Sequence, residues 1–210
     1  MNNWVKNLEP LIKKYGKRKI PLDYHNRYQL VVMVLLAAQT SDNQINKVTV
    51  PFFETYPSLS ELKKSTPEDL HPFLKSIRGF RKKSGWLVDL AKTIGEDSKI
   101  PTTLKELTKL PGIGRKTANV IIRESGDKAE GVVVDLHVVR VAPRLGVVSS
   151  NKPEKIEGQL MEVMPQEKWN EIGMTLSFHG RETCRPKPKC DECEVSSVCN
   201  YYKTSVIAAK

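Results

Sequence analysis

Four cysteines near the end of the chain form a candidate metal site. They are Cys184, Cys190, Cys193 and Cys199, and the chain contains no other cysteine. A structural zinc site usually brings two close cysteine pairs, whereas only Cys190 and Cys193 form such a pair here. A [4Fe–4S] cluster also takes four cysteine ligands and can be wrapped by one loop. The spacing leaves zinc and iron–sulfur open and leans modestly towards iron–sulfur.

A second stretch suited to chemistry is Leu110–Asn119, in which Gly112 and Gly114 precede Arg115 and Lys116. Proline and glycine end one helical run and open another, so the stretch predicts two helices joined by a tight hairpin. Free N–H groups at the start of the second helix favour an anion. In a chain of net charge +10, the expected anion is a nucleic-acid phosphate. We expect both glycines to let the backbone approach that ligand closely.

The elements that must position these residues are helices. Residues 28–38 are apolar on all sides, as in a central buried helix, while residues 4–15 show one apolar face. Residues 132–134 are the only strand-like piece and have no evident pairing partner. We therefore predict an all-α fold of about ten helices, with Trp4, Trp86 and Trp169 in the core. The predicted helix starts are Ser41 with Gln44, Thr103 with Glu106, and Asn151 with Glu154.

Length and composition exclude several classes of protein. The apolar and charged fractions, 39% and 28%, are those of a soluble globular chain. The longest apolar run, residues 30–38, is too short to span a bilayer, and no signal peptide is evident, which predicts a cytoplasmic location. A pI near 9.4 suggests a polyanionic partner, although an ordinary basic surface would give the same charge.

Taken together, these motifs resemble one family. Leu110–Val120, Val134–Val138 and the four cysteines are similar to endonuclease III, a helix-hairpin-helix-GPD DNA glycosylase with an iron–sulfur cluster. Leu35–Asp42 and Ile77–Phe80 extend the resemblance to nearly the whole chain. The first gap between the cysteines holds five residues, where the family commonly has six.

The resemblance implies a bilobal all-α fold. Residues 22–132 would form a helical barrel domain with the helix-hairpin-helix, and residues 1–21 plus 133–210 a second lobe with the cluster loop. The implied protein is a monomeric, nucleoid-associated prokaryotic enzyme of base excision repair, acting on double-stranded DNA with damaged bases or abasic sites. It would remove oxidised pyrimidines as an N-glycosylase and cleave the abasic site by β-elimination as an AP lyase, with a [4Fe–4S] cluster as cofactor.

Two residues match the family's catalytic pair. Lys116 would attack C1′ of the damaged nucleotide as a neutral amine and form a Schiff base. Burial, the neighbouring Arg115 and the positive helix end predict a lowered pKa for this lysine. Asp135 would stabilise charge developing on the sugar, and its structural alternative is to cap the helix that begins near Leu136. Leu136 stands where the family usually has threonine, which removes a hydroxyl beside the carboxylate.

Further residues are implied to contact DNA. Gln39 matches the residue that fills the gap left by a flipped nucleotide. Phe80 matches the family's apolar residue that wedges into the opposite DNA strand, although the loop here is one residue shorter than usual. The alternative is that Phe80 belongs to the core. No acid interrupts the basic residues around it, Lys75, Arg78, Arg81, Lys82 and Lys83, which favours a DNA-facing loop over an ordinary solvated face. The predicted DNA-contacting set is Gln39, Phe80, Arg81, Lys82, Gly112, Gly114, Arg115, His137, Arg185, Lys187 and Lys189.

Other functions remain open at this point. A glycosylase for mismatched or alkylated bases, an AP lyase alone, and a non-catalytic DNA-binding iron–sulfur protein all fit parts of the sequence. The spacing of Lys116 and Asp135 argues against the last of these, because DNA binding by itself needs neither residue.

Overall fold

The computed structural model describes residues 3–208, and every regular element within them is helical. The predicted all-α fold is therefore confirmed, and residues 132–134 form a buried connection between helices. The chain divides into two compact units. We call Lys19–Asp127 the hairpin unit, and Met1–Arg18 with Lys128–Lys210 the cysteine unit. The domain division predicted at residues 22 and 132 stays a prediction.

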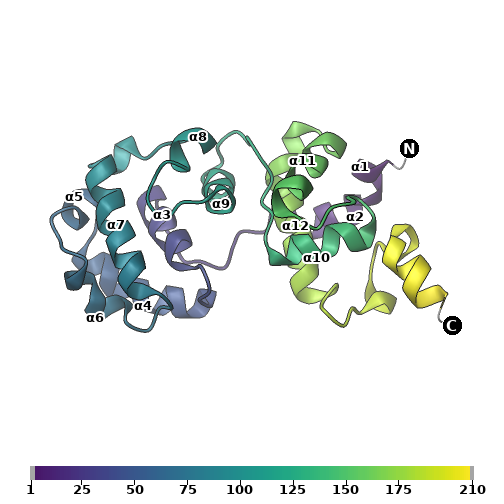
Figure 1. Cartoon of the computed structure of the whole chain (residues 1–210), viewed down its shortest axis with the longest axis horizontal. Helices are drawn as coiled ribbons and strands as arrows, with labels where there is room; N and C mark the ends of the chain where they lie inside the picture. The colour runs from purple at the N-terminus through teal and green to yellow at the C-terminus, as the bar shows by residue number, and fades with distance from the viewer. Residues whose placement is uncertain (1–2, 209–210) are drawn as a thin grey trace. The chain divides into compact units, whose positions relative to one another are not determined.

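The hairpin unit is built around one buried helix. Helix α3 is apolar on all sides and packs against α4, α7 and α9 (Figure 1). Its position confirms the central helix predicted at residues 28–38, since a helix without a polar face must be surrounded by others. The α-helices of this unit are α3 (Arg27–Leu36), α4 (Asp42–Thr55), α5 (Leu59–Leu62), α6 (His71–Leu74), α7 (Phe80–Ile94), α8 (Leu104–Leu107) and α9 (Arg115–Ser125). Short 3-10 turns cover Glu68–Leu70 and Asp97–Lys99.

Two predicted helix starts in this unit are found. The Ser41 hydroxyl accepts a hydrogen bond from the Gln44 backbone N–H at 3.3 Å, which begins α4. The Gln44 side chain does not complete the capping box and instead donates to the Ser76 hydroxyl at 2.8 Å. Thr103 likewise accepts from the backbone N–H of Glu106 and begins α8.

The cysteine unit is organised by α12, which packs against α10 and α2 (Figure 1). Its α-helices are α1 (Trp4–Asn7), α2 (Glu9–Tyr15), α10 (Leu136–Leu145), α11 (Pro153–Val163) and α12 (Trp169–Glu182). The 3-10 turns are Gln166–Lys168, Cys190–Glu192 and Ser196–Val198, and a π-helix covers Tyr202–Ile207. The four cysteines lie after α12, in a segment that is mostly irregular.

Two local predictions in the cysteine unit are wrong. Residues 4–15 form two helices, because Pro10 lies in the first turn of α2 and cannot continue α1. Helix α11 begins at Pro153 after Lys152, without the side-chain cap expected from Asn151. Proline suits the first helical position because its missing N–H would have no partner there.

The prediction that all three tryptophans lie in the core holds only for Trp4. Trp86 and Trp169 are half-buried. The Trp169 indole donates a hydrogen bond to the Met164 carbonyl at 2.9 Å.

In the described part of the chain, no helix combines the length and apolar character needed to cross a membrane.

Candidate active site

The predicted hairpin is present between α8 and α9. Gly112 has φ +75°, and a Cβ atom there would lie 2.8 Å from the Trp86 ring. This position thus needs glycine for its backbone conformation and for its contact with Trp86. Gly114 precedes α9 with no side-chain cap and open space around its Cα, so the first N–H groups of α9 can meet a ligand. The predicted close approach to a ligand therefore suits Gly114, whereas a protein side chain occupies that space at Gly112.

Lys116 lies in the first turn of α9 and its side chain is exposed. The burial predicted for it is therefore wrong, because α9 turns its other face to the core. Ala118, Ile121 and Ile122 occupy that buried face and hold α9 against α3. Arg115 is exposed beside Lys116. The helix thus presents two cationic side chains outward from a firmly packed element.

Gln39 has an unusual backbone conformation. Among the described residues it is the only non-glycine with positive φ, at 59°. This conformation costs a residue with a side chain about 1 kcal/mol or more, and such strain persists only where neighbours enforce it. Gln39 is exposed just after the end of α3.

Lys83 supplies part of that enforcement. Its side chain is buried, with a 5% exposed fraction, and its ammonium donates to the Leu36 carbonyl at 2.8 Å and the Ala38 carbonyl at 2.6 Å. Burial lowers the pKa of this lysine. The prediction that Lys83 belongs to a DNA-facing surface is wrong, because it caps the last carbonyls of α3. Helical spacing was the signal, since Leu87 and Leu90 follow Lys83 on the buried face of α7.

The start of α7 carries the other predicted contacts. Phe80 is half-buried, and its ring meets the edge of the His71 ring at 5.0 Å between centroids. The exposed Arg81 places its guanidinium 5.1 Å from the Phe80 ring centre. The exposed Lys82 places its ammonium 4.9 Å from the Trp86 ring centre. Phe80 is thus no core residue, and each of the two cations lies over an aromatic ring, of which Trp86 also packs against Gly112.

Asp135 is the N-cap of α10, as its structural alternative predicted. Its Oδ1 accepts hydrogen bonds from the backbone N–H groups of His137 at 2.9 Å and Val138 at 3.0 Å. Its Oδ2 accepts from the Ser177 hydroxyl at 2.6 Å, and Arg181 lies 4.0 Å away. Leu136 has no hydroxyl and is 69% exposed, so the hydroxyl beside this carboxylate comes from α12 instead. Sequence reasoning missed Ser177.

His137 lies in the first turn of α10 and contacts Arg140. The His137 Nδ1 is 3.2 Å from a terminal nitrogen of the Arg140 guanidinium. Arg140 also donates to the Gly180 carbonyl at 2.9 Å and the Cys184 carbonyl at 3.1 Å. It therefore joins α10 to the end of α12 and to the first cysteine. The DNA contact expected of His137 stays a prediction.

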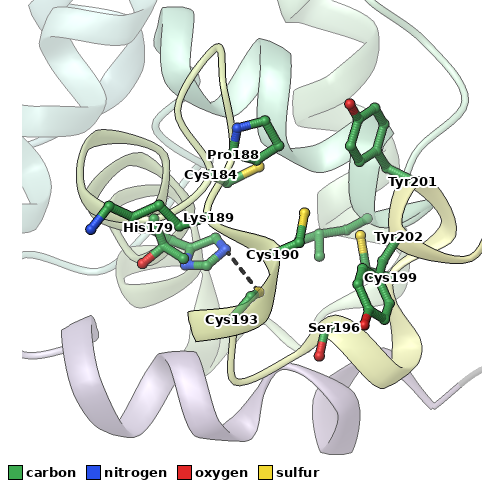
Figure 2. A pocket seen from close by; sticks show the side chains of 12 residues that line it. His179, Cys184, Pro188, Lys189, Cys190, Cys193, Ser196, Cys199, Tyr201 and Tyr202 are labelled. Atoms are coloured by element: carbon green, nitrogen blue, oxygen red, sulfur yellow. Dashed lines mark hydrogen bonds between the residues drawn. The ribbon is translucent and has the colours of Figure 1, made fainter. Parts of the chain in front are cut away.

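All four cysteines line one cavity, together with His179, Tyr201 and Tyr202 (Figure 2). No disulfide joins them. The Cys193 Sγ is 3.7 Å from the His179 Nε2, the contact drawn as a dashed line in Figure 2. Within residues 3–208, no three donors of the His, Cys, Asp or Glu type come close enough to hold a metal ion. The thiols therefore surround a space and do not meet at a point.

The surroundings of Cys190 and Cys193 disfavour the negatively charged form of their thiols. Burial, followed by the nearby thiols, raises the pKa of Cys190, while burial also raises that of Cys193. Burial lowers the pKa of His179 to about 4, which keeps its ring neutral at pH 7. Arg144 donates to the Arg185 carbonyl at 2.8 Å and approaches the Cys184 Sγ at 3.7 Å. A set of four thiolates partly removed from water at this place thus requires more positive charge than the side chains supply.

The loop between the first two cysteines exposes Arg185, Lys187 and Lys189. Lys189 forms an ion pair with Glu192 at 3.1 Å, which reduces the charge that it can offer to a phosphate. The Arg185 side chain donates to the Arg181 carbonyl at 3.0 Å, which holds it against the end of α12. DNA contacts of these three residues stay predictions.

The structure brings some predicted site residues together and separates others between the units. The Gln39 turn is joined to the first turn of α7, and the four cysteines share a cavity. Lys116 belongs to the hairpin unit and Asp135 to the cysteine unit. The pairing of these two catalytic candidates stays a prediction.

Known proteins are similar to this chain along almost its full length. A sequence model of the HhH-GPD superfamily of base excision DNA repair proteins matches residues 32–166. Endonuclease III of Rickettsia felis is 36% identical over 207 residues, which cover 97% of this chain and 96% of that protein. Endonuclease III of Synechocystis is 35% identical, with 90% and 88% covered.

A solved structure leads to the same family. The structure of a trapped endonuclease III–DNA covalent intermediate, an estranged-adenine complex, has a TM-score of 0.87 and 30% sequence identity. The match covers 98% of this chain and 99% of that chain. The chain therefore belongs to the HhH-GPD superfamily of base excision DNA repair proteins and, within it, to the endonuclease III family.

Proposed function

We propose that this chain is a base excision repair enzyme that acts on double-stranded DNA as a DNA glycosylase and AP lyase. The observation that carries the proposal is the exposed Lys116 in the first turn of α9, at a helix start without a side-chain cap. A phosphate bound at that helix start would hold DNA beside the lysine. Family membership supports the same activity, because relatives along nearly the whole chain are endonuclease III proteins.

The two catalytic candidates would divide the chemistry between them. The neutral Lys116 amine attacks C1′, the bond between C1′ and the base breaks, and the base leaves with the electron pair and takes up a proton. The bound amine then loses a proton and the C1′–O4′ bond breaks, so that the sugar ring opens, O4′ takes up a proton and a protonated Schiff base joins Lys116 to C1′. Loss of a proton from C2′ then breaks the C3′–O bond, and the 3′ phosphate leaves with the electron pair, which is the β-elimination. The Asp135 carboxylate stabilises positive charge on the sugar and assists proton transfers. Oxidised pyrimidines are the lesion class that we assign.

To act as a nucleophile, the Lys116 amine must be partly shielded from water, but in the protein without DNA this side chain is exposed. Bound DNA would cover the first turn of α9 and remove water from this group. The Gln39 turn would fill the gap in the stack after the nucleotide is flipped out. Phe80, Arg81 and Lys82 would contact the duplex beside it.

A [4Fe–4S] cluster fits the cysteine cavity. Cys184, Cys190, Cys193 and Cys199 would hold it, since a cluster takes its ligands at separate corners and the thiols surround a space. Its iron would supply the positive charge that buried thiolates require. When bound, the cluster would cross-link residues 184–199 and order the loop that carries Arg185 and Lys187. We place the protein as a monomer in a prokaryotic cytoplasm, associated with the nucleoid.

Borohydride trapping tests the enzymatic proposal. The wild type should form a covalent adduct with a duplex that contains one abasic site, and Lys116→Ala should form none. The matched control is Lys109→Ala, which removes an exposed lysine from the same hairpin. Trapping by Lys116→Ala would overturn the assignment of the nucleophile. No trapping by folded wild-type protein would overturn the lyase activity.

Iron analysis and visible absorption test the cluster. Protein purified without oxygen should be brown and hold about four iron atoms per chain. Cys193→Ser should lose both, whereas Ser196→Ala, a change in the lining of the same cavity, should keep them. A colourless wild-type protein with one zinc ion would contradict the proposal.

A further inference from the structure

We propose that Ser177 is a positioning residue for base release, and that its hydroxyl fixes the reactive oxygen of the Asp135 carboxylate. The inference rests on the proposed function, because it requires Asp135 to act on the substrate. It concerns a residue on α12, 42 positions away in the sequence.

The contact itself is short and shielded. The Ser177 hydroxyl donates to the Asp135 Oδ2 at 2.6 Å, within the range of hydrogen bonds from a hydroxyl to a charged carboxylate. The Ser177 side chain has no exposed surface, so water does not compete for this hydroxyl. The Asp135 side chain keeps a 9% exposed fraction. The serine end of the contact is thus closed to solvent, whereas the carboxylate end keeps exposed surface through which it can contact a substrate.

The two oxygens of Asp135 have different tasks. Oδ1 accepts from two backbone N–H groups and is committed to the cap of α10. Oδ2 is therefore the oxygen left for the sugar, and among residues 3–208 its one hydrogen-bond donor from a side chain is Ser177. Arg181, at 4.0 Å from the same oxygen, is beyond hydrogen-bond reach. Ser177 therefore sets the direction in which the remaining lone pair of Oδ2 points.

The packing of α12 explains how a serine reaches this place. A Cβ atom on Gly173 would lie 2.4 Å from the Val133 carbonyl oxygen, and one on Gly180 would lie 2.9 Å from the His137 Cβ. These glycines stand four positions before and three positions after Ser177, so all three lie on one face of α12. The absence of side chains at both glycines lets the segment around Asp135 approach the helix. Ser177 meets the carboxylate between these two close contacts.

Removal of the Ser177 hydroxyl should slow base release and leave DNA binding nearly unchanged. We expect Ser177→Ala to slow single-turnover release of an oxidised pyrimidine by about ten-fold or more, the cost typical of one hydrogen bond to a charged group. The affinity for a duplex with a stable abasic-site analogue should stay within about two-fold, because Ser177 has no exposed surface for DNA. Ser177→Thr, which keeps the hydroxyl, should restore most of the rate.

Thr175→Val provides the matched control. Thr175 is equally buried on α12, and its hydroxyl has no hydrogen-bond partner among the described residues. Its removal should leave the rate unchanged. Thermal unfolding of all variants shows whether each protein is folded at the assay temperature.

The outcomes separate this inference from the proposed function. Release at the wild-type rate by folded Ser177→Ala, together with slowed release by Asp135→Asn, would overturn the role of Ser177 and leave the enzyme assignment intact. Equal losses of affinity and rate would assign Ser177 a purely structural role and also overturn the inference. Full activity of Asp135→Asn would instead refute the catalytic role of Asp135, on which the inference depends.

Discussion

Lys116 and Asp135 are held in contrasting ways. Lys116 is exposed on the first turn of α9, and buried residues on the opposite face of the helix keep it in place. Asp135 is fixed by two backbone N–H groups and one buried hydroxyl, with only 9% of its side chain exposed. A nucleophile that must reach a sugar needs a free end, whereas a carboxylate that stabilises charge works best when its direction is preset. Each unit thus holds its group in a way that suits the task proposed for it.

The strongest test of the contrast is the change Lys116→Ala. It should remove borohydride trapping altogether and yet change the free energy of unfolding by no more than about 0.5 kcal/mol, because the side chain is exposed. Denaturant unfolding measured beside trapping shows both effects. A large loss of stability would mean that the Lys116 side chain is part of the fold and is not the free end described above.

Loss of iron should affect the two units unequally. We expect removal of the proposed cluster to unfold residues 184–199 and weaken the cysteine unit, while α3 and α9 in the hairpin unit keep their packing. Hydrogen exchange followed by mass spectrometry can resolve both units in one sample. Equal loss of protection in α3 would contradict the independence of the hairpin unit.

Substitutions at Asp135 should separate stability from chemistry. Asp135→Ala removes the cap of α10 and leaves the Ser177 hydroxyl unpaired, so we expect a loss of about 2 kcal/mol in the free energy of unfolding. Asp135→Asn keeps a capping oxygen and should retain most of that stability but slow base release. Similar unfolding of the two variants would show that the cap contributes little.

Lys83 offers a subtler test within the hairpin unit. Lys83→Met should leave the Leu36 and Ala38 carbonyls without their donor and loosen the Gln39 turn. Release of a stacked lesion should fall by about ten-fold, a penalty of similar size to losing one such contact. Cleavage of a preformed abasic site should change much less, because the missing base already interrupts the base stack of the duplex. The control is Lys92→Met, which removes an exposed lysine from the same helix and should leave both rates unchanged. Equal losses on both substrates for Lys83→Met would count against a role in nucleotide flipping.

The smallest expected effect is a gain of stability. Gln39→Gly relieves the positive φ at this position and should raise the free energy of unfolding by about 0.5–1 kcal/mol while slowing release of a stacked lesion. Denaturant unfolding and single-turnover assays measure the two effects. A loss of stability would show that the Gln39 side chain contributes to the fold and not to DNA contact alone.

Local patterns in the sequence correctly predicted the helical class, the hairpin and the grouping of the four cysteines. The apolar run of α3 predicted a buried helix, glycines with a flanking proline predicted the hairpin, and Ser41 and Thr103 predicted helix starts. These predictions succeeded because periodicity, turns and caps depend on residues within a few positions of one another. The crowded cysteines, likewise local, line one cavity.

Contacts between distant residues were decided only by the tertiary structure. Lys83 reads as one more surface cation but meets Leu36, 47 positions earlier, inside the unit. Gly112 reads as a ligand contact but lies against Trp86. Ser177 carries no signal of its own, because its role exists only where α12 meets the Asp135 carboxylate. The physical reason is the same in each case: burial and hydrogen bonding depend on which helices pack together, and sequence spacing does not encode that choice locally.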